Sequence, residues 1–312
     1  MRVISNIGRL KNIKGVVLVI GVFDGLHRGH QALIKKALLR ARALKTKLVV
    51  MTFYPHPVHV LHPEVNLPYI ASLSQRLKLL EELGVFLCLV IKFTKRFARL
   101  SPERFIKRYL LKYFHPQEVY VGDDFRFGQD RQGTIEYFCQ MGERHGFKVN
   151  HIIPVKGGRG KISSTDIRRL ITAGKLARAA QFLGRRVSLM GRVEKGDGRG
   201  KGLGFPTANI YPRNHVLPPG GVYAVYAAIG RRQFKGMANI GKRPSFYSPL
   251  KSVNLEVHLF DFHQNLYGRE IVVEFVKKVR EERPFAAREE LTFQLKQDEV
   301  LVKAILRRKK IE

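Results

Sequence analysis

The strongest constraint on the fold is the regular exchange of short apolar runs and amphipathic segments along the first part of the chain. Apolar runs of strand length occur at residues 16–22, 47–53, 85–91, 118–121 and 147–153. Segments with helical spacing occur at residues 30–44, 74–83, 102–112, 133–144 and 164–172. This alternation predicts an α/β domain with a parallel sheet covered on both faces. Ligands of such sheets bind at the carboxyl ends of the strands, so functional residues are expected directly after the strands.

The pattern changes after Gly184. Short alternating segments at residues 222–229, 234–240, 253–260 and 271–279 are separated by Gly and Pro turns, which is typical of a small antiparallel β-barrel. From residue 286 to about residue 308, Leu291, Leu295, Val302 and Ile305 have the spacing of an amphipathic helix that closes the barrel. A length of 312 residues also exceeds one compact core. We therefore expect two domains, residues 1–184 and 185–312.

The charge balance limits the classes of partner. The chain has 57 Lys and Arg against 25 Asp and Glu, which gives a formal net charge of +32 at pH 7. A field of this size attracts polyanions or small anionic substrates such as ATP. The basic residues are scattered along the chain, and the only run is at residues 307–310. Nucleic-acid binding is therefore kept only as an alternative that rests on charge.

Cysteine content and hydropathy bear on compartment and class. Cys88 and Cys139 are the only cysteines, and they form no Cys-x-x-Cys pair, so neither a disulfide framework nor a cysteine metal site is expected. Cys88 lies in the apolar run 85–91 and is expected to be buried. No apolar stretch has the length of a signal peptide or a membrane span. A soluble cytoplasmic protein is the simplest expectation.

A glycine-rich turn at residues 21–30 joins the first expected strand to the first helix. Gly21, Gly25 and Gly29 allow a sharp turn and the close approach of a ligand, and the helix N-terminus offers free N–H groups to a phosphate. His27 and His30 can both face the same anion and stabilise charge that builds on a transferring phosphoryl group. Histidines at a helix start can also act as caps, but their place in a glycine-rich turn favours a phosphate site.

A second phosphate-binding pattern occurs at residues 163–168. Ser163, Ser164 and Thr165 can cap a helix and donate hydroxyls to phosphate. Arg168 lies one turn further on the same face, where its guanidinium can bind phosphate oxygens. Alone, this pattern favours an ordinary capped helix; beside the turn at residues 21–30 with His27 and His30 (the histidine turn), phosphate binding is the better interpretation.

A loop of alternating glycines, Gly196 to Gly204, lies near the start of the second domain. Such a loop exposes backbone N–H groups that can surround phosphates, although it lacks the Walker and protein-kinase motifs. A flexible hinge is the competing interpretation, but a hinge does not explain the Pro-Thr-Ala-Asn segment at residues 206–209. There Thr207 and Asn209 present a hydroxyl and an amide oxygen, which are suitable ligands for a hard metal ion.

Taken in order, these motifs resemble those of the bacterial bifunctional riboflavin kinases/FAD synthetases. Residues 21–30 resemble the family signature Gly-x-Phe-Asp-Gly-x-His-x-Gly-His, and residues 52–57, 122–128 and 162–168 resemble its next three motifs. Residues 196–209 resemble the riboflavin-kinase signature, and residues 254–258 resemble the segment with its catalytic carboxylate. Further matches occur at residues 220–224, 241–244, 266–268 and 280–285. The sequence departs from the family at Tyr54, usually acidic, and at Ser245, commonly Thr.

The resemblance implies a Rossmann-like nucleotidyltransferase domain that adenylylates FMN to FAD and releases pyrophosphate. The catalytic residues expected there are His27 and His30. The residues expected to bind ATP and its phosphates are Gly21, Phe23, Asp24, Gly25, Gly29, Ser163, Ser164, Thr165 and Arg168. Those expected to bind the flavin are Phe53, His56, Asp124, Phe125 and Phe127. The two phenylalanines of the 122–128 motif can equally stack on a flavin or fill the core.

The resemblance implies that the second domain is a β-barrel riboflavin kinase that phosphorylates riboflavin to FMN. Glu256 is then the general base for the riboflavin 5′-hydroxyl, and Thr207 and Asn209 bind Mg²⁺ beside the ATP phosphates. The residues expected at the phosphates are Gly196, Asp197, Gly198, Gly200 and Gly204, and those expected at the flavin are Arg280 and Glu282. The implied ligands are Mg²⁺ with ATP, and riboflavin, FMN and FAD as substrates and products. A single-activity nucleotidyltransferase with a merely flavin-binding second domain is the alternative.

Overall fold

The structure is a computed structural model that describes residues 1–10, 13–152, 162–196, 198, 200–243 and 252–307. The expectations for residue 153, Asp197, Ser245 and the basic residues 308–310 lie outside these ranges. The chain forms two compact units, one of Met1–Leu67 and Leu73–Ser164, the other of Pro68–Ser72 and Thr165–Glu312. The domain boundary expected near residue 184 stays a prediction.

The first unit contains a parallel sheet with the strand order β1-β4-β3-β2-β5-β6. Its strands are β1 (Arg2–Ile4), β2 (Val17–Ile20), β3 (Leu48–Tyr54), β4 (Leu87–Lys92), β5 (Glu118–Gly122) and β6 (Lys148–Ile152). The chain winds from β2 through β3 to β4, and then returns to place β5 and β6 on the other side of β2. The winding therefore reverses between β2 and β5, and open α/β sheets bind ligands at the carboxyl ends of strands at such a reversal.

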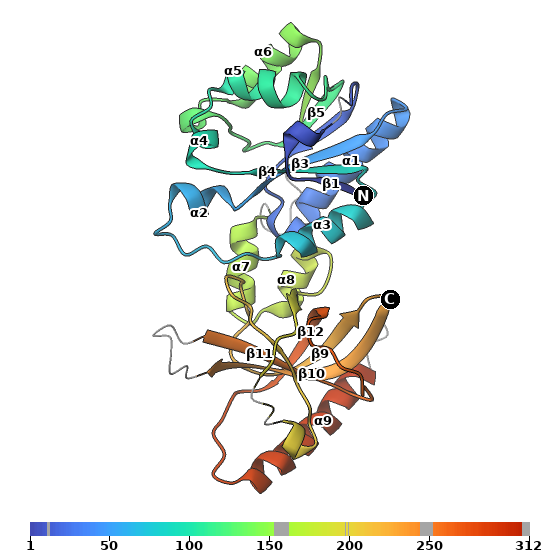
Figure 1. The fold of residues 1–312 in the computed structure, drawn as a ribbon, viewed down its shortest axis with the longest axis vertical. Coiled ribbons are helices and arrows are strands. Elements are labelled where there is room, and N and C mark those ends of the chain that lie inside the picture. Colours follow the sequence, from blue (N-terminus) through green and yellow to red (C-terminus); the bar gives the residue numbers. More distant parts are fainter. Residues whose placement is uncertain (11–12, 153–161, 197, 199, 244–251, 308–312) are drawn as a thin grey trace. The chain divides into compact units, whose positions relative to one another are not determined.

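Helices cover both faces of this sheet, as the alternation predicts (Figure 1). The helices of this unit are α1 (Arg28–Ala43), α2 (Pro57–Leu61), α3 (Leu73–Glu82), α4 (Lys95–Ala98), α5 (Pro102–Phe105), the π-helical turn η3 (Ile106–Leu111) and α6 (Ile135–His145), of which α2 contributes no residue to either core. Alternate residues of β2 enter opposite cores: Leu18 and Ile20 join the core of α5, η3 and α6, while Val17 and Val19 join that of α1 and α3. The single helix expected at 102–112 is divided, because η3 widens its last turn.

The second unit is built on an antiparallel sheet of six strands in the order β7-β12-β9-β10-β11-β8. The strands are β7 (Ser188–Arg192), β8 (Ala208–Ile210), β9 (Gly221–Ile229), β10 (Arg232–Arg243), β11 (Ser252–Leu259) and β12 (Glu270–Arg280), and helices α7 (Ser164–Thr172) and α8 (Leu176–Leu183) precede them. A bridge between Glu194 and Asn209 nearly closes the sheet into a barrel. Helix α9 (Arg288–Arg307) packs on it through Val302 and Leu306. The expected small barrel with a closing helix is confirmed.

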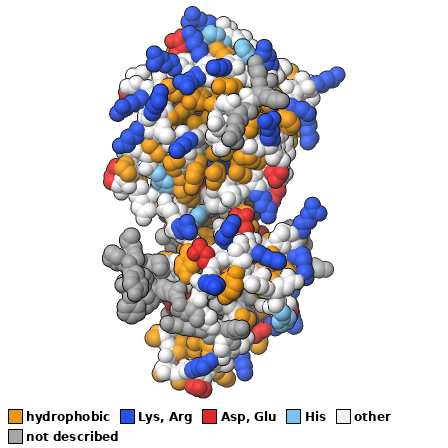
Figure 2. All heavy atoms as spheres, in the orientation of Figure 1, with side chains coloured by type: hydrophobic (Ala, Val, Ile, Leu, Met, Phe, Trp, Pro, Cys, Tyr) orange, Lys and Arg blue, Asp and Glu red, His pale blue; other side chains and the backbone are white. Residues whose placement is uncertain are grey.

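The structure shows how the excess of Lys and Arg is distributed on one face of the surface. Lys and Arg side chains are dispersed over the face drawn in Figure 2 and do not gather into one stripe there. In the described ranges, no helix is both long enough and apolar enough to cross a bilayer. Cys88, in β4, is fully buried, as its apolar run predicts.

Candidate active sites

The turn after β2 has a conformation that few sequences allow. Phe23 lies in the left-handed region at φ 55°, and Gly25 follows at φ 74°. Phe23 is only 1% exposed, so its ring is held in the core while its backbone is strained. Backbone strain of this kind costs of order 1–2 kcal/mol and persists where the surroundings fix it, often at functional sites. The turn brings the chain directly into α1.

His27 and His30 lie together at the N-terminus of α1. The Nδ1 atom of His27 accepts a hydrogen bond from the backbone N–H of His30 at 3.4 Å, so His27 is the N-cap of the helix. The two rings are stacked with centroids 3.7 Å apart, and Phe23 meets His30 edge-on at 5.3 Å. Capping and phosphate binding are therefore compatible, because the cap uses only Nδ1 and leaves the proton of a neutral His27 ring on Nε2.

His30 is held as a neutral imidazole. Burial lowers the pKa of His30 well below its usual 6.5, and the charges of His27 and Arg76 lower it further. Its Nδ1 atom is buried and has no hydrogen-bond partner within the described residues. A neutral imidazole with an unused ring nitrogen can donate to or accept from a ligand at this helix end.

The sheet places two further predicted motifs at this end of the first unit. The hydroxyl of Ser164 donates to the backbone carbonyl of Asp24 at 3.1 Å, which brings the start of the 163–168 pattern onto the histidine turn. The loop after β5, which holds Asp124, leaves the strand next to β2 in the sheet. Within the second unit, Arg168 donates through Nε to the Pro68 carbonyl at 2.7 Å, and its contact with phosphate stays a prediction.

The predicted flavin residues of the first unit divide between core and surface. Phe127 is 8% exposed and packs against Phe138 at 4.9 Å between ring centroids, so it fills the core. Phe125 is half-buried and stacks on Phe127. Phe53 is buried beside Phe93 and Phe97. The remaining two are polar: Asp124 is exposed, and His56 caps α2 by accepting from the Val58 N–H at 3.2 Å.

The second candidate site lies where the glycine loop meets β8 and β11. Asn209 is 6% exposed, and its Oδ1 accepts from Asn254 Nδ2 at 2.9 Å. The same Asn254 nitrogen donates to Glu256 Oε1 at 3.0 Å. Gly196 touches the Asn209 amide so closely that a Cβ there would lie 2.3 Å from Nδ2. Strand pairing thus brings together two predicted residues, Asn209 and Glu256, and Asn254, which was expected only as part of the motif at residues 254–258.

The oxygen donors of this site fit a hard cation. Asn254 Oδ1 is buried and has no hydrogen-bond partner among the described residues. Asn209, Thr207 and Glu256 add amide, hydroxyl and carboxylate oxygens, and Thr207 and Glu256 are half-buried. Mg²⁺ prefers such oxygens and usually keeps phosphates among its ligands. The described residues contain no group of three His, Cys, Asp or Glu side chains that could hold a metal ion.

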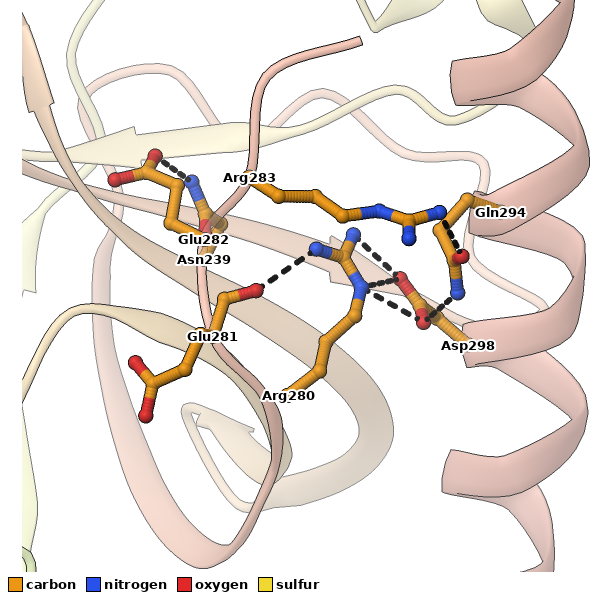
Figure 3. A network of polar contacts seen from close by, with 7 residues as sticks. All are labelled: Asn239, Arg280, Glu281, Glu282, Arg283, Gln294 and Asp298. Carbon is orange, nitrogen blue, oxygen red and sulfur yellow. Dashed lines mark hydrogen bonds and ion pairs between the residues drawn. The ribbon is translucent and has the colours of Figure 1, made fainter.

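Arg280 and Glu282, expected at the flavin, lie at the end of β12 (Figure 3). Arg280 binds both carboxylate oxygens of Asp298 at 2.8–3.0 Å, and Asp298, in α9, is only 2% exposed. Gln294 donates to the same carboxylate at 2.9 Å. Glu282 accepts from Asn239 at 3.1 Å. Arg280 therefore fastens α9 to the barrel, a role that the sequence did not indicate; flavin contacts of both residues stay predictions.

Two family models, curated relatives and a solved structure match this chain. A family model for FAD synthetase matches residues 10–166, and one for riboflavin kinase matches residues 183–306. The chain is 38% identical over 303 residues to the bifunctional riboflavin kinase/FMN adenylyltransferase of Escherichia coli (strain K12), with 96% of each chain covered. It is 37% identical over 294 residues to that of Bacillus subtilis (strain 168), with 90% of each covered. A Streptococcus pneumoniae crystal structure, described as a macrolide-efflux protein, has TM-score 0.82 and 32% identity over 96% of this chain and 98% of that one.

Proposed function

The chain belongs to the family of bifunctional riboflavin kinases/FMN adenylyltransferases, and from that premise we propose which of its residues carry each activity. It carries FAD synthetase activity in its N-terminal region and riboflavin kinase activity in its C-terminal region. Together these reactions convert riboflavin to FMN and FMN to FAD. The alternative of a single-activity nucleotidyltransferase is set aside.

The first unit performs adenylyl transfer at the histidine turn. A phosphate oxygen of FMN attacks the α-phosphorus of ATP, and the bond from that phosphorus to pyrophosphate breaks. The attacking group is already an anion, so no general base is needed and catalysis consists of positioning and charge stabilisation. The stacked pair of His27 and His30 at the start of α1 supports this proposal most directly. The imidazole rings donate N–H groups to the developing charge, and the helix N-terminus adds backbone donors.

The second unit performs phosphoryl transfer next to Glu256. The carboxylate takes the proton of the riboflavin 5′-hydroxyl, the hydroxyl oxygen forms a bond to the γ-phosphorus of ATP, and ADP leaves. Asn254 holds the carboxylate through its hydrogen bond to Glu256 Oε1 at 3.0 Å. The glycine loop, with Gly196, Gly198, Gly200 and Gly204, surrounds the phosphates with backbone N–H groups. The half-buried place of Glu256 beside the loop supports this role.

Mg²⁺ is the cation for which we propose Thr207 and Asn209 as ligands. The unpartnered oxygen of Asn254 and the amide of Asn209 support this assignment. When bound, Mg²⁺ neutralises charge on the ATP phosphates.

The flavin contacts are proposed from the aromatic side chains. The half-buried Phe125 offers apolar ring surface in the first unit, and the family motifs add Phe53, Asp124 and His56 to the proposed contacts. In the second unit, Arg280 is the last residue of β12 and Glu282 follows the strand. Flat aromatic surface with a few polar groups is the usual recognition pattern for a ring such as the isoalloxazine.

Two variants separate the sites. His30→Ala is expected to slow FAD formation from FMN by about 10²-fold, because one preorganised donor is lost, and to leave riboflavin phosphorylation unchanged. Glu256→Gln is expected to slow FMN formation from riboflavin by about 10²- to 10⁴-fold, because the base is lost, and to leave FAD formation from supplied FMN unchanged. Chromatography of the products measures both rates, and the retained activity shows that the protein is folded. Loss of both activities in a folded variant contradicts this division of labour.

A further inference from the structure

Arg76 is a fully buried cation beneath the first site. It lies on α3 and is 0% exposed, and it is the largest fully buried side chain among the described residues. Taking a guanidinium out of water costs several kcal/mol unless acceptors replace the water. A charge retained in such a place needs a physical reason beyond packing.

The guanidinium joins the ends of two neighbouring strands. Its Nη1 atom donates to the Val22 carbonyl at 2.8 Å and approaches the Phe53 carbonyl at 3.3 Å and the Thr52 hydroxyl at 3.4 Å. The Thr52 hydroxyl in turn donates to the Val22 carbonyl at 2.9 Å. Val22 follows β2 and Phe53 lies near the end of β3, strands that pair directly in the sheet.

Each of these carbonyls belongs to a segment of the proposed first site. Val22 lies at the start of the turn at residues 21–30, and Phe53 lies in the segment at residues 52–57 that also holds His56. The charge of Arg76 also reaches the turn, since it contributes to the lowered pKa of His30. The charges that act on His30 are that of His27, from its own turn, and that of Arg76, from α3.

We propose that Arg76 is a positioning residue for adenylyl transfer, whose guanidinium fixes the distance between the histidine turn and the segment at residues 52–57. This inference rests on the assignment of adenylyl transfer to the first unit. Arg76 touches no reacting atom; it acts through Val22, Thr52 and Phe53. All three of these contacts are made by Nη1, a planar donor held at a fixed angle, whereas a lysine ammonium is a point charge on a flexible stem. Its fixed charge also favours the neutral form of His30.

The test compares Arg76→Met, Arg76→Lys and the control Lys78→Met. Lys78 lies on the same helix but is exposed, so its replacement removes the same charge without touching the strand ends. In FAD formation from FMN and ATP, Arg76→Met is expected to lower kcat by about 10²-fold, the effect of misplacing reacting groups by about 1 Å. Arg76→Lys is expected to lower kcat by about tenfold, since the charge stays and the planar donor held at Nη1 is lost. Lys78→Met is expected to match the wild type.

The pH profile separates positioning from simple destabilisation. At low pH the rate is expected to fall as His30 takes up a proton, and this fall is the acid limb of the pH–rate profile. In Arg76→Met the limb is expected to move to higher pH, towards 6.5, because one of the charges that lower the pKa of His30 is gone. A purely structural role lowers Tm and the active fraction but leaves the limb unmoved. Riboflavin phosphorylation by the same protein reports the concentration of intact chain. If Arg76→Met does not fold, Arg76→Lys decides: an unchanged kcat overturns the inference.

The outcomes also separate this inference from the function on which it rests. A wild-type chain that makes no FAD refutes the assignment of the first unit, and the role of Arg76 with it. A wild-type chain that makes FAD, beside an Arg76→Met variant with the same kcat and acid limb, refutes the role of Arg76 alone.

Discussion

Replacing Gly196 with alanine tests the proposed metal site through a single added carbon. The backbone of Gly196 is outside the left-handed region, so alanine fits its conformation, but the new Cβ would lie 2.3 Å from Nδ2 and 2.7 Å from Oδ1 of Asn209. Ordinary contacts to a Cβ begin near 3.4 Å, so the Asn209 amide must retreat by about 1 Å. Asn209 is buried and bonded to Asn254, which also holds Glu256. The displacement therefore reaches both the proposed ligand and the base.

The expected result is a selective loss of the kinase. Misplacement by about 1 Å costs about 10²-fold in rate, which corresponds to about 2.7 kcal/mol of barrier. The assay is riboflavin phosphorylation at several Mg²⁺ concentrations, with FAD formation from FMN as the internal control. Higher Mg²⁺ is expected to recover part of the lost rate if Asn209 is a ligand.

Gly230→Ala is the matched control in the same unit. Gly230, in the turn between β9 and β10, is at φ 60° with open space around its Cα, so alanine adds backbone strain of about 1 kcal/mol but no contact with Asn209. Its kinase rate is expected to stay within a few-fold of the wild type. A Gly196→Ala enzyme as fast as the wild type, or a Gly230→Ala enzyme equally impaired, refutes the contact with Asn209 as the cause.

Three further predictions concern protonation and stability. The pKa of His30 is lowered in the folded protein, so below pH 6.5 the unfolded chain binds a proton at His30 that the folded chain does not. The free energy of unfolding, measured by urea titration, should therefore fall between pH 7.5 and 5.5, and His30→Gln should reduce this fall. Asp298→Ala leaves Arg280 without its carboxylate and is expected to lower the free energy of unfolding by about 3 kcal/mol in urea; a change below about 0.5 kcal/mol would contradict this. Burial raises the pKa of the Cys88 thiol to about 12, so at pH 8 a thiol reagent should leave Cys88 unlabelled until denaturant is added, whereas Cys139 is accessible in part.

Much of the fold follows from the sequence because buried parallel strands are continuous apolar runs. Strands β2 to β5 coincide with such runs, and α1 begins where the glycine turn ends. Strands β7 and β8 were not predicted. Strand β8 has only three residues, and β7 begins with Ser188 and ends with Arg192, so neither forms an apolar run of strand length. The separate helix α8 was also missed, since the sequence between Thr172 and Gly184 gave no distinct start signal.

The site residues that the sequence predicts are those that lie close together along the chain. Local signals, such as the histidine turn and the glycine loop, identify residues that lie close in sequence. The contact of Asn209 with Asn254 depends on the pairing of β8 with β11, and the ion pair of Arg280 with Asp298 depends on how α9 packs. Arg76 belongs to the same class: an arginine in an amphipathic helix indicates a solvent-exposed position, and only the tertiary structure reveals its burial.

The most direct test of two activities on one chain is a product assay on the purified protein. With riboflavin, ATP and Mg²⁺, chromatography should show FMN appearing first and FAD following as FMN is consumed. Accumulation of FMN without FAD contradicts the role given to His27 and His30. Untouched riboflavin, with FAD still formed from supplied FMN, contradicts the role given to Glu256 and the glycine loop.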